Sequence, residues 1–354
     1  MSDVQARRSF KLVEFGGPLQ EVTEAPPQPE GTQVLLKVRA CGVCHSDIHI
    51  ADGYFDLGHG QKMDLGRGIK LPRVLGHEIV GEVVAAGPEA EGVTPGDRRI
   101  VFPWGGCGQC LLCRQGNEHI CARPRSHGTT LDGGFSTYLL ADHPRYLVAY
   151  DPLPDAFAAT LACSGLTAFG AIRKAAPVDA EHPLLIIGAG GLGLAAVGLA
   201  RAVYGVGPVV AEIDPAKRQA ALDAGASEAV DPNEEGIRKR LLQATEGFAS
   251  AIDFVGAQST AELGMAVLRK GGKLIVVGLF GGAIEVPVPT LPLRAIALNG
   301  SYVGSLEELR ELVDLARAGH IQPVPLETRP LDAAQATLDD LRAGRIRGRA
   351  VLTP

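Results

Sequence analysis

The chain has 354 residues and a formal net charge of −6, from 34 Lys and Arg against 40 Asp and Glu. One hydrophobic core rarely grows beyond about 250–300 residues, so we expect two domains. The acidic balance and the lack of a long basic run or an uninterrupted apolar stretch of bilayer length argue against nucleic acid and membranes as partners. The first residues contain no apolar signal core, so we expect a cytoplasmic protein with reduced thiols.

The first 150 residues are rich in short predicted strands. Turn residues bound apolar or alternating runs at 34–40, 79–85, 98–102 and 135–140. This half of the chain is therefore predicted to be mainly β-structure.

Helical and strand patterns alternate after residue 155. The predicted helices are 156–175, 195–203 and 215–224, and the predicted apolar strands are 183–188, 208–213, 251–255 and 273–277. Fully apolar strands that alternate with helices predict a doubly wound parallel sheet. Helices near 305–318 and 332–343 and a strand at 349–352 follow, and these could complete either domain.

Four of the seven cysteines cluster in a short segment. They are Cys107, Cys110, Cys113 and Cys121. Four thiolates about 2.3 Å from one ion make a closed structural zinc site. Disulfides or an iron–sulfur cluster are the alternatives, but nothing else indicates secretion and the spacing differs from common ferredoxin patterns. The segment 104–122 is therefore predicted to be a structural zinc lobe.

A glycine-rich turn follows the apolar strand predicted at 183–188. It has the pattern G-x-G-x-x-G and contains Gly188, Gly190, Gly191, Leu192 and Gly193. Such a turn lets a pyrophosphate approach the backbone at a helix N-terminus. Glu212 ends the next predicted strand, about 20 residues further on, where a carboxylate accepts hydrogen bonds from a ribose 2′-hydroxyl. The sequence therefore favours NAD over NADP, although Asp214 could replace Glu212 and Arg218 could soften the preference.

The remaining cysteines, Cys41, Cys44 and Cys163, raise the question of a second metal site. Two thiolates and one imidazole, which His77 could supply, would leave a fourth position of zinc open for chemistry. A zinc ion with an open position can bind an alcohol and lower its pKa, or bind a carbonyl group and polarise it. A zinc pair of Cys41 and Cys44 is an alternative, but we favour Cys41 as a small buried residue at a strand end. His77 alone would more often be a core histidine.

The whole pattern resembles the zinc-dependent medium-chain alcohol dehydrogenase family. The resemblance rests on the run from Gly76 to Gly87, the cysteine lobe, the glycine-rich turn and their order, and it covers nearly the whole chain. It implies an α/β fold with a GroES-like β-rich catalytic domain over 1–160, completed by 303–354. A Rossmann domain with a doubly wound parallel sheet would occupy 161–302. A metal-free reductase of the same superfamily would lack most of these thiols.

The resemblance also implies a set of metal ligands and neighbours. Cys44, His77 and Cys163 would bind a catalytic zinc ion. Glu78 would lie close behind that ion and could exchange as a ligand, and Asp47 would orient the ligand histidine.

A proton relay and further cofactor contacts are implied in the same way. Ser46 would hydrogen-bond the alcohol oxygen. The ribose hydroxyl of the cofactor and His49 would then pass the proton to solvent, which suits an imidazole that titrates near neutrality. Further contacts with the dinucleotide would come from His45, Thr167, Lys217 and Arg349. Taken singly, Ser46 could be a cap, and His49 and Arg349 could be solvated surface residues.

The implied activity is reversible hydride transfer between a primary or secondary alcohol and NAD. It would use two zinc ions per chain, one catalytic and one structural, in a homodimer or homotetramer built through the cofactor domains. Alternatives on the same scaffold are a formaldehyde, polyol or amino-alcohol dehydrogenase, and Cys163 argues against the polyol branch, where an acid often stands. A nucleotide-sensing or structural relative without turnover would not need an open zinc with a proton relay.

One segment departs from the family pattern. Cys44 and His77 stand further apart than in many members, and the surplus lies around residues 52–70, a glycine-rich stretch. Loops anchored by rigid elements commonly carry function. We predict that this insertion roofs the substrate cleft or reaches a neighbouring subunit, and that Trp104 and Tyr54 are pocket walls.

Overall fold

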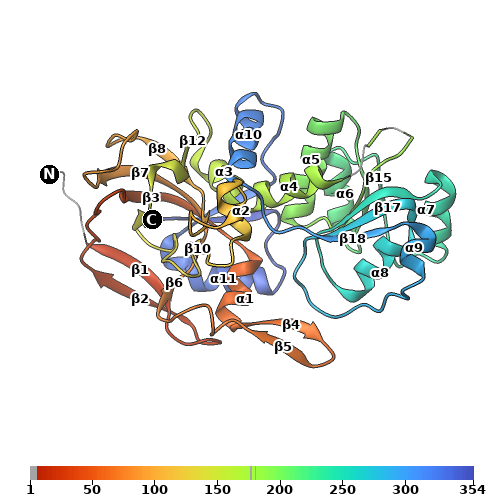
Figure 1. The fold of residues 1–354 in the computed structure, drawn as a ribbon, viewed down its shortest axis with the longest axis horizontal. Coiled ribbons are helices and arrows are strands. Elements are labelled where there is room, and N and C mark those ends of the chain that lie inside the picture. The colour runs from red at the N-terminus through yellow and green to blue at the C-terminus, as the bar shows by residue number, and fades with distance from the viewer. Residues whose placement is uncertain (1–5, 176–177, 180) are drawn as a thin grey trace.

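The protein contains a mixed sheet and a parallel sheet that lie next to each other (Figure 1). The structure is a computed structural model and describes residues 6–175, 178–179 and 181–354. The parallel sheet follows the mixed sheet in the sequence, except that the last two strands of the chain return to the mixed sheet. The architecture is α/β, which confirms the predicted fold class.

The mixed sheet has seven strands in the order β12-β8-β7-β3-β20-β19, with β11 also paired to β3. Its strands are β3 (Val34–Val43), β7 (Glu78–Ala86), β8 (Arg98–Val101), β11 (Tyr138–Ala141), β12 (Leu147–Ala149), β19 (Leu326–Pro330) and β20 (Arg349–Thr353). The strand β20 pairs antiparallel with β3, and Leu352 lies opposite Cys41. The chain therefore ends beside the strand that leads into the candidate site.

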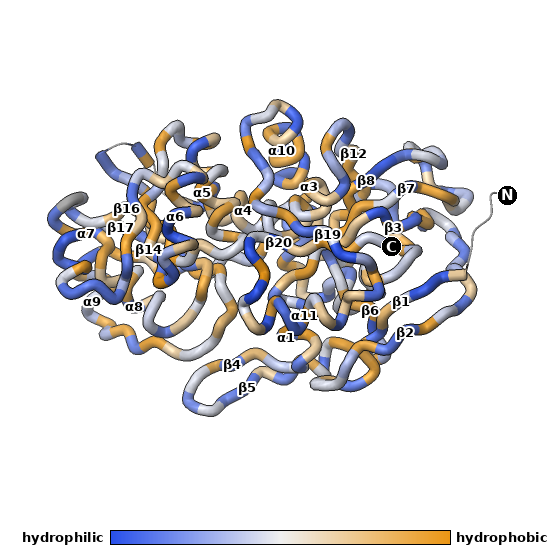
Figure 2. The backbone as a smooth tube through the Cα atoms, turned by 180° about the vertical axis from the view of Figure 1, so that it is seen from behind, coloured by the Kyte–Doolittle hydropathy of each residue, from blue (hydrophilic) through white to orange (hydrophobic). Residues whose placement is uncertain are grey.

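The parallel sheet has six strands in the order β15-β14-β13-β16-β17-β18. They are β13 (Leu185–Ile187), β14 (Val209–Ala211), β15 (Glu228–Val230), β16 (Phe248–Asp253), β17 (Leu268–Val276) and β18 (Ala297–Gly300). Every residue of β13, β14 and β16 is buried, and the apolar colouring of β14 and β16 is visible in Figure 2. The strand order reverses at β13, which has β14 and β16 on its two sides, and ligands of such sheets bind at this switch point.

Helices cover the parallel sheet. They are α5 (Gly191–Tyr204), α6 (Pro215–Asp223), α7 (Ile237–Thr245), α8 (Gln258–Ala266) and α9 (Thr290–Arg294). These helices bury the faces of the sheet, which explains why its strands are continuous apolar runs.

Smaller elements complete the first half of the chain and its C-terminal return. A three-stranded sheet has the order β2-β1-β6, and β9 pairs with β10. These elements are β1 (Arg7–Leu12), β2 (Leu19–Glu24), α1 (His45–Asp52), β6 (Arg73–Val74), β9 (Trp104–Gly105), α2 (Leu111–Arg114), β10 (Arg125–Ser126), α10 (Leu306–Arg317) and α11 (Ala334–Arg342). Short 3₁₀ turns lie at Glu118–Ile120, Pro144–Tyr146 and Leu331–Ala333.

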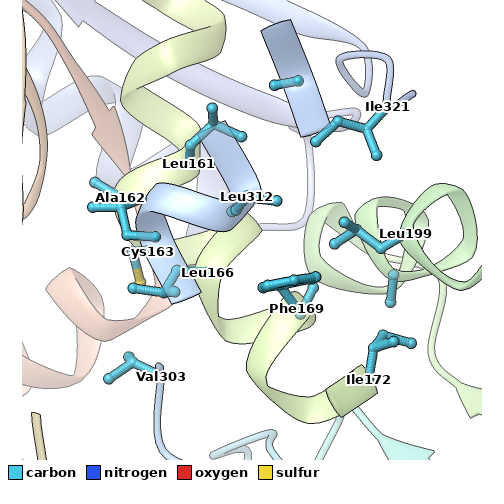
Figure 3. Packing of buried hydrophobic residues seen from close by; sticks show 14 of the residues in the cluster. Leu161, Ala162, Cys163, Leu166, Phe169, Ile172, Leu199, Val303, Leu312 and Ile321 are labelled. Atoms are coloured by element: carbon cyan, nitrogen blue, oxygen red, sulfur yellow. The ribbon is translucent and has the colours of Figure 1, made fainter. Parts of the chain in front are cut away.

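One continuous helical stretch, Asp155–Lys174, connects the two sheets. It consists of α3 (Asp155–Thr160), one π-helical turn (Leu161–Gly165) and α4 (Leu166–Lys174). Its length and apolar composition would suit a membrane span, so the prediction that no apolar stretch has bilayer length was wrong. However, 89% of the relevant window is buried inside the protein. Figure 3 shows its apolar side chains packed with Leu312 of α10 and Leu199 of α5, as expected of a core helix.

The insertion around residues 52–70 contains a β-hairpin of β4 (Tyr54–Gly58) and β5 (Gln61–Asp64). It extends from the mixed-sheet half towards the other half (Figure 1). A methyl group at Gly58 would lie 2.7 Å from the backbone nitrogen of Ala283, and one at Gly281 would lie 2.8 Å from Cβ of Asp56. The hairpin therefore touches the parallel-sheet half of its own chain. Its predicted contact with a substrate or a neighbouring subunit stays a prediction.

Candidate active site

One buried carboxylate joins the end of β3 to the start of β7. The strand β3 ends at Val43, and Cys44 is the N-cap of α1. The carboxylate of Asp47 accepts hydrogen bonds from the backbone N–H of Cys44 at 2.9 Å and of Gly76 at 3.1 Å. An acid at the third helical position commonly reaches back to the cap in this way. Cys44 and Gly76, which are 32 positions apart in the chain, are thereby held together.

The same carboxylate orients His77. Its Nδ1 lies 3.2 Å from Oδ1 of Asp47, and both side chains are buried. An imidazole nitrogen that faces a carboxylate carries the proton, so Nε2 is left as the electron-pair donor. Nε2 is buried and has no hydrogen-bond partner among the described residues. A buried acceptor without a partner costs free energy, and a bound metal would satisfy it.

A group of four buried side chains could hold a metal ion at this point. The ligand atoms of Cys44, His77, Glu78 and Cys163 all lie within 4.8 Å of one another. Cys163 reaches the group from the π-helical turn, a local widening that is frequent at functional sites. A hydrogen bond from Cys163 lowers the pKa of Cys44 well below its usual value, and His77 adds to this effect. Two sulfurs and one imidazole fit a zinc ion with an open fourth position.

Glu78 is shared between this group and the glycine-rich turn. Its Oε1 accepts hydrogen bonds from the guanidinium of Arg349 and from the backbone N–H of Ser164, whereas Oε2 has no partner among the described residues. Arg349 is buried, and its Cδ lies 2.6 Å from where a methyl group on Gly191 would sit. This arginine therefore links the metal-binding group to the dinucleotide turn. Its contact with a pyrophosphate stays a prediction.

The predicted relay residues lie on α1, close to the metal-binding group. Oγ of Ser46 is 3.8 Å from Sγ of Cys44, and Ser46 and His49 are both half-buried. Burial lowers the pKa of His49, and its ring lies 5.0 Å from that of Phe55 in the hairpin. His45, the first residue of the helix, is exposed.

The three glycines of the predicted motif have three different surroundings. Gly188 has φ +91°, which an L side chain rarely adopts, and it makes the tight turn after β13. A methyl group at Gly193 would lie 1.9 Å from the carbonyl oxygen of Gly188, so only glycine lets α5 approach the strand. A methyl group at Gly190 would point into open space, where a pyrophosphate would approach the backbone. The turn therefore fits a dinucleotide.

Other predicted cofactor residues surround this turn. Glu212 is buried, and its carboxylate accepts hydrogen bonds from the backbone N–H of Ala189 at 2.7 Å and of Asp214 at 3.0 Å. Lys217 is exposed on α6, and Thr167 is buried with Oγ1 4.0 Å from Sγ of Cys163. Arg218 forms an ion pair with Asp231 at 3.2 Å, so its charge is already partly engaged.

The four cysteines of the lobe also converge. Their sulfurs lie within 4.8 Å of one another, with 3.4 Å between Cys110 and Cys113 and 3.8 Å between Cys110 and Cys121. Tetrahedral zinc with bonds of about 2.3 Å separates its sulfurs by about 3.8 Å. All four are free cysteines, so the disulfide alternative does not apply to them. Backbone N–H groups lower the pKa of Cys107 to about 6, as suits a thiolate ligand.

Two family models match the chain. The alcohol dehydrogenase GroES-like domain matches residues 30–154, and the zinc-binding dehydrogenase domain matches residues 191–318. An NAD-dependent alcohol dehydrogenase of Sulfurisphaera tokodaii is 37% identical over 350 residues, which are 98% of this chain and 100% of the relative. The chain belongs to the zinc-dependent medium-chain alcohol dehydrogenase family.

Similar proteins of this dehydrogenase family do not all have the same activity. D-arabinose 1-dehydrogenase (NADP(+)) of Saccharolobus solfataricus is 32% identical and covers 97% of this chain and 96% of its own length. The solved alcohol dehydrogenase of Aeropyrum pernix has a TM-score of 0.87 and 31% identity over 98% of this chain and 100% of its own. The family is thus secure, whereas substrate and cofactor choice vary within it.

Tyr302 is a residue near the site that the sequence analysis did not single out. The ring of Trp104 lies 5.2 Å from that of His77 and 5.8 Å from that of Tyr302. Tyr302 follows β18, and the next residue, Val303, has φ +38°, which is a genuine outlier for a β-branched side chain. Strained backbone tends to collect at functional sites. The sequence could have indicated Tyr302 through its position after the last parallel strand, because ligands of such sheets bind beyond the carboxyl ends of the strands.

Proposed function

We propose that the protein catalyses reversible hydride transfer between primary or secondary alcohols and NAD. One observation carries the proposal: the buried group of Cys44, His77 and Cys163 is linked through Glu78 and Arg349 to the glycine-rich turn. A metal site for the alcohol oxygen and a dinucleotide site are therefore adjacent. Relatives of 37% identity that are named NAD-dependent alcohol dehydrogenases support this function.

Two groups supply the reactivity, and the chain positions them. We propose two zinc ions per chain: one at Cys44, His77 and Cys163 with Glu78 as an exchanging ligand, and a structural one at Cys107, Cys110, Cys113 and Cys121. When bound, the catalytic zinc would supply a Lewis acid for the substrate oxygen, and NAD would supply the hydride acceptor. Asp47 holds the imidazole of His77 with Nε2 directed at the metal position.

Proton transfer falls to two side chains of α1. The hydroxyl of Ser46 lies 3.8 Å from Sγ of Cys44 and can hydrogen-bond an alcohol oxygen there. His49 is one turn further along the helix and accepts the proton as the alcohol is oxidised. We infer that Ser46 and His49 are the catalytic pair.

The cofactor we propose is NAD rather than NADP. The buried carboxylate of Glu212 would accept hydrogen bonds from the adenosine ribose and repel a 2′-phosphate. The contacts that complete the cofactor site are assigned to His45, Thr167, Lys217, Arg349 and the residues of the glycine-rich turn.

We also propose that the protein is a cytoplasmic homo-oligomer, a dimer or a tetramer, with a cofactor domain over 161–302. The edge strand β18 favours pairing through this domain, because all four of its residues are exposed and it pairs on one side only. An open apolar strand edge favours pairing with another chain.

A substrate panel tests the function. The purified holoenzyme is given primary, secondary, polyhydroxy and amino alcohols and hydrated formaldehyde, each with NAD and with NADP, and reduced cofactor is followed by its absorbance. We expect the highest kcat/KM for a simple primary or secondary alcohol with NAD. A higher kcat/KM for polyols or for NADP would contradict that choice of substrate or cofactor. An absence of hydride transfer from every alcohol would contradict the function.

A further inference from the structure

An ion pair stands beside His49 on the side away from the metal-binding group. Asp52 follows His49 by three positions on α1, so the two side chains share one face of the helix. Arg342 is the last residue of α11, and its Nη2 lies 2.6 Å from Oδ1 of Asp52. The pair therefore joins the end of α1 to the end of α11, and no role has yet been assigned to it.

The same pair lies on the wall of a surface cavity of about 160 Å³. Gly16, Ala51 and Asp339 contribute to the other walls. Such a volume can hold several water molecules, and the two charged side chains provide polar partners for them. The cavity therefore offers water a place beside Asp52, three positions after His49 on the same helix.

Stability alone gives little reason for this pair. The side chain of Asp52 is 31% exposed and that of Arg342 is 54% exposed, and pairs with such exposure contribute little to stability. A carboxylate at the C-terminal end of a helix is also unfavourable, because the helix dipole is negative there. Asp52 occupies this position at the end of α1.

The charges that face His49 act in opposite directions. Burial of the ring lowers the pKa of His49, Asp52 and the Cys44 sulfur raise it, and Arg342 lowers it again. His45 on the same helix is a further titratable neighbour, and the ring of Phe55 in the hairpin lies 5.0 Å from that of His49. The ion pair thus places one charge of each sign next to the relay histidine.

We propose that Asp52 and Arg342 are positioning residues at the outer end of the proton relay, where they set the proton affinity of His49 and hold the water that exchanges its proton. This inference rests on the proposed function. In alcohol oxidation, the hydroxyl proton passes through Ser46 to the imidazole of His49. It then leaves to water in the cavity, while the hydride with its two electrons goes to NAD. No further oxidant is needed.

Single and double variants separate the two charges. Neutral His49 accepts the proton, so kcat/KM for alcohol oxidation rises with pH as the imidazolium is lost. Asp52→Asn removes a charge that raises the pKa of His49. We therefore expect the rising limb of the plot of kcat/KM against pH to move to lower pH by about half a unit or more. Arg342→Gln removes a charge that lowers the pKa of His49, so the rising limb moves to higher pH by a similar amount. The double variant returns close to wild type, and Asp52→Glu keeps the wild-type limb.

A direct titration avoids dependence on turnover. The pKa of His49 is read by NMR in protein labelled at the histidine ring carbon, with the resonance assigned by its loss in His49→Gln. We expect the same two opposite shifts as in the pH profiles. Asp339→Asn is the matched control, because this residue lines the same cavity but is not among the charges that act on His49.

The outcomes distinguish this inference from the proposed function. If the wild type oxidises alcohols but both variants move the limb and the NMR titration in the same direction, or not at all, the positioning role is wrong. If the wild type oxidises no alcohol, the proposed function fails, and the NMR titration still decides whether the pair sets the pKa of His49.

Discussion

Cys41 and Cys44 are three residues apart but have different surroundings. Methyl groups at Gly76 and at Gly134 would each lie 2.7 Å from Sγ of Cys41, so this sulfur fills a tight space in the core. Burial raises the pKa of Cys41 well above its usual value, as expected of an inert thiol. Cys44 instead belongs to the candidate metal group, and its pKa is lowered. The surroundings therefore separate a packing cysteine from a ligand cysteine.

The first prediction uses this pair. Cys44→Ser removes a soft ligand from the site, so we expect the loss of one of two zinc ions per chain and of turnover by at least ~100-fold. Binding of NAD is retained, because the glycine-rich turn is not altered. Zinc content is measured by elemental analysis, and cofactor binding is measured by fluorescence.

The matched control is Cys41→Ala. It removes a sulfur of the same strand-to-helix segment and should keep both zinc ions and turnover, with a modest loss of stability. Wild-type turnover and zinc content in Cys44→Ser would show that the metal assignment is wrong.

Among the elements, the β4–β5 hairpin has the least expected placement. Its turn contains two glycines with the same left-handed conformation: Gly58 has φ +79° and Gly60 has φ +75°. A methyl group at Gly58 would collide with Gly282 and Ala283, whereas one at Gly60 would have nothing within 4 Å. Only one of the two glycines is therefore required for contact with the parallel-sheet half.

The second prediction compares alanine at these positions. Both variants force an L side chain into a left-handed conformation, at a cost of about 1–2 kcal/mol. Gly58→Ala also displaces the hairpin from residues 281–283, which we expect to cost a further ~1–3 kcal/mol through overpacking. Amide hydrogen exchange should accelerate over residues 54–64 in both variants, and more strongly in Gly58→Ala than in Gly60→Ala.

Equal exchange in the two variants would mean that the hairpin is held by its own strands rather than by the other half. The hydrogen-exchange measurement is made on the zinc-loaded protein, so that metal loss does not contribute.

At the scale of the whole molecule, apolar surface collects near the open edge of the parallel sheet. Phe280, Val288 and Leu293 are about three-quarters exposed, and Leu298 of β18 is 46% exposed. Monomeric proteins rarely leave such surface beside an open strand edge, because it promotes aggregation. Pairing of β18 with β18 of a second subunit about a twofold axis would cover this open edge.

The third prediction follows from this edge. Leu298→Lys places a charge in the strand, so we expect the oligomer to dissociate by one step, from tetramer to dimer or from dimer to monomer. Light scattering after size-exclusion chromatography measures the mass. Leu222→Lys is the control, because this leucine is 41% exposed on α6, away from the edge. A mass unchanged by Leu298→Lys would place the interface elsewhere.

Much of the fold and the candidate site could be predicted from local patterns. The strands around 34–40 and 79–85, the parallel sheet and the glycine-rich turn depend on alternation and on backbone freedom, which neighbouring residues reveal. The separate roles of Gly188, Gly190 and Gly193 follow from the same local geometry. The central helix 155–174 was predicted too, but its apolar length did not show whether protein or membrane covers it.

The sequence by itself determined the fold class, the family and which side chains have metal-binding chemistry, because spacing and residue type carry that information. The family resemblance also implied that Asp47 meets His77, whereas only the tertiary structure decided that Glu78 meets Arg349 and that the hairpin meets residues 281–283. The pairing of Asp52 with Arg342 likewise joins residues 290 positions apart. Such contacts depend on how complete elements pack, and no local sequence pattern encodes that packing.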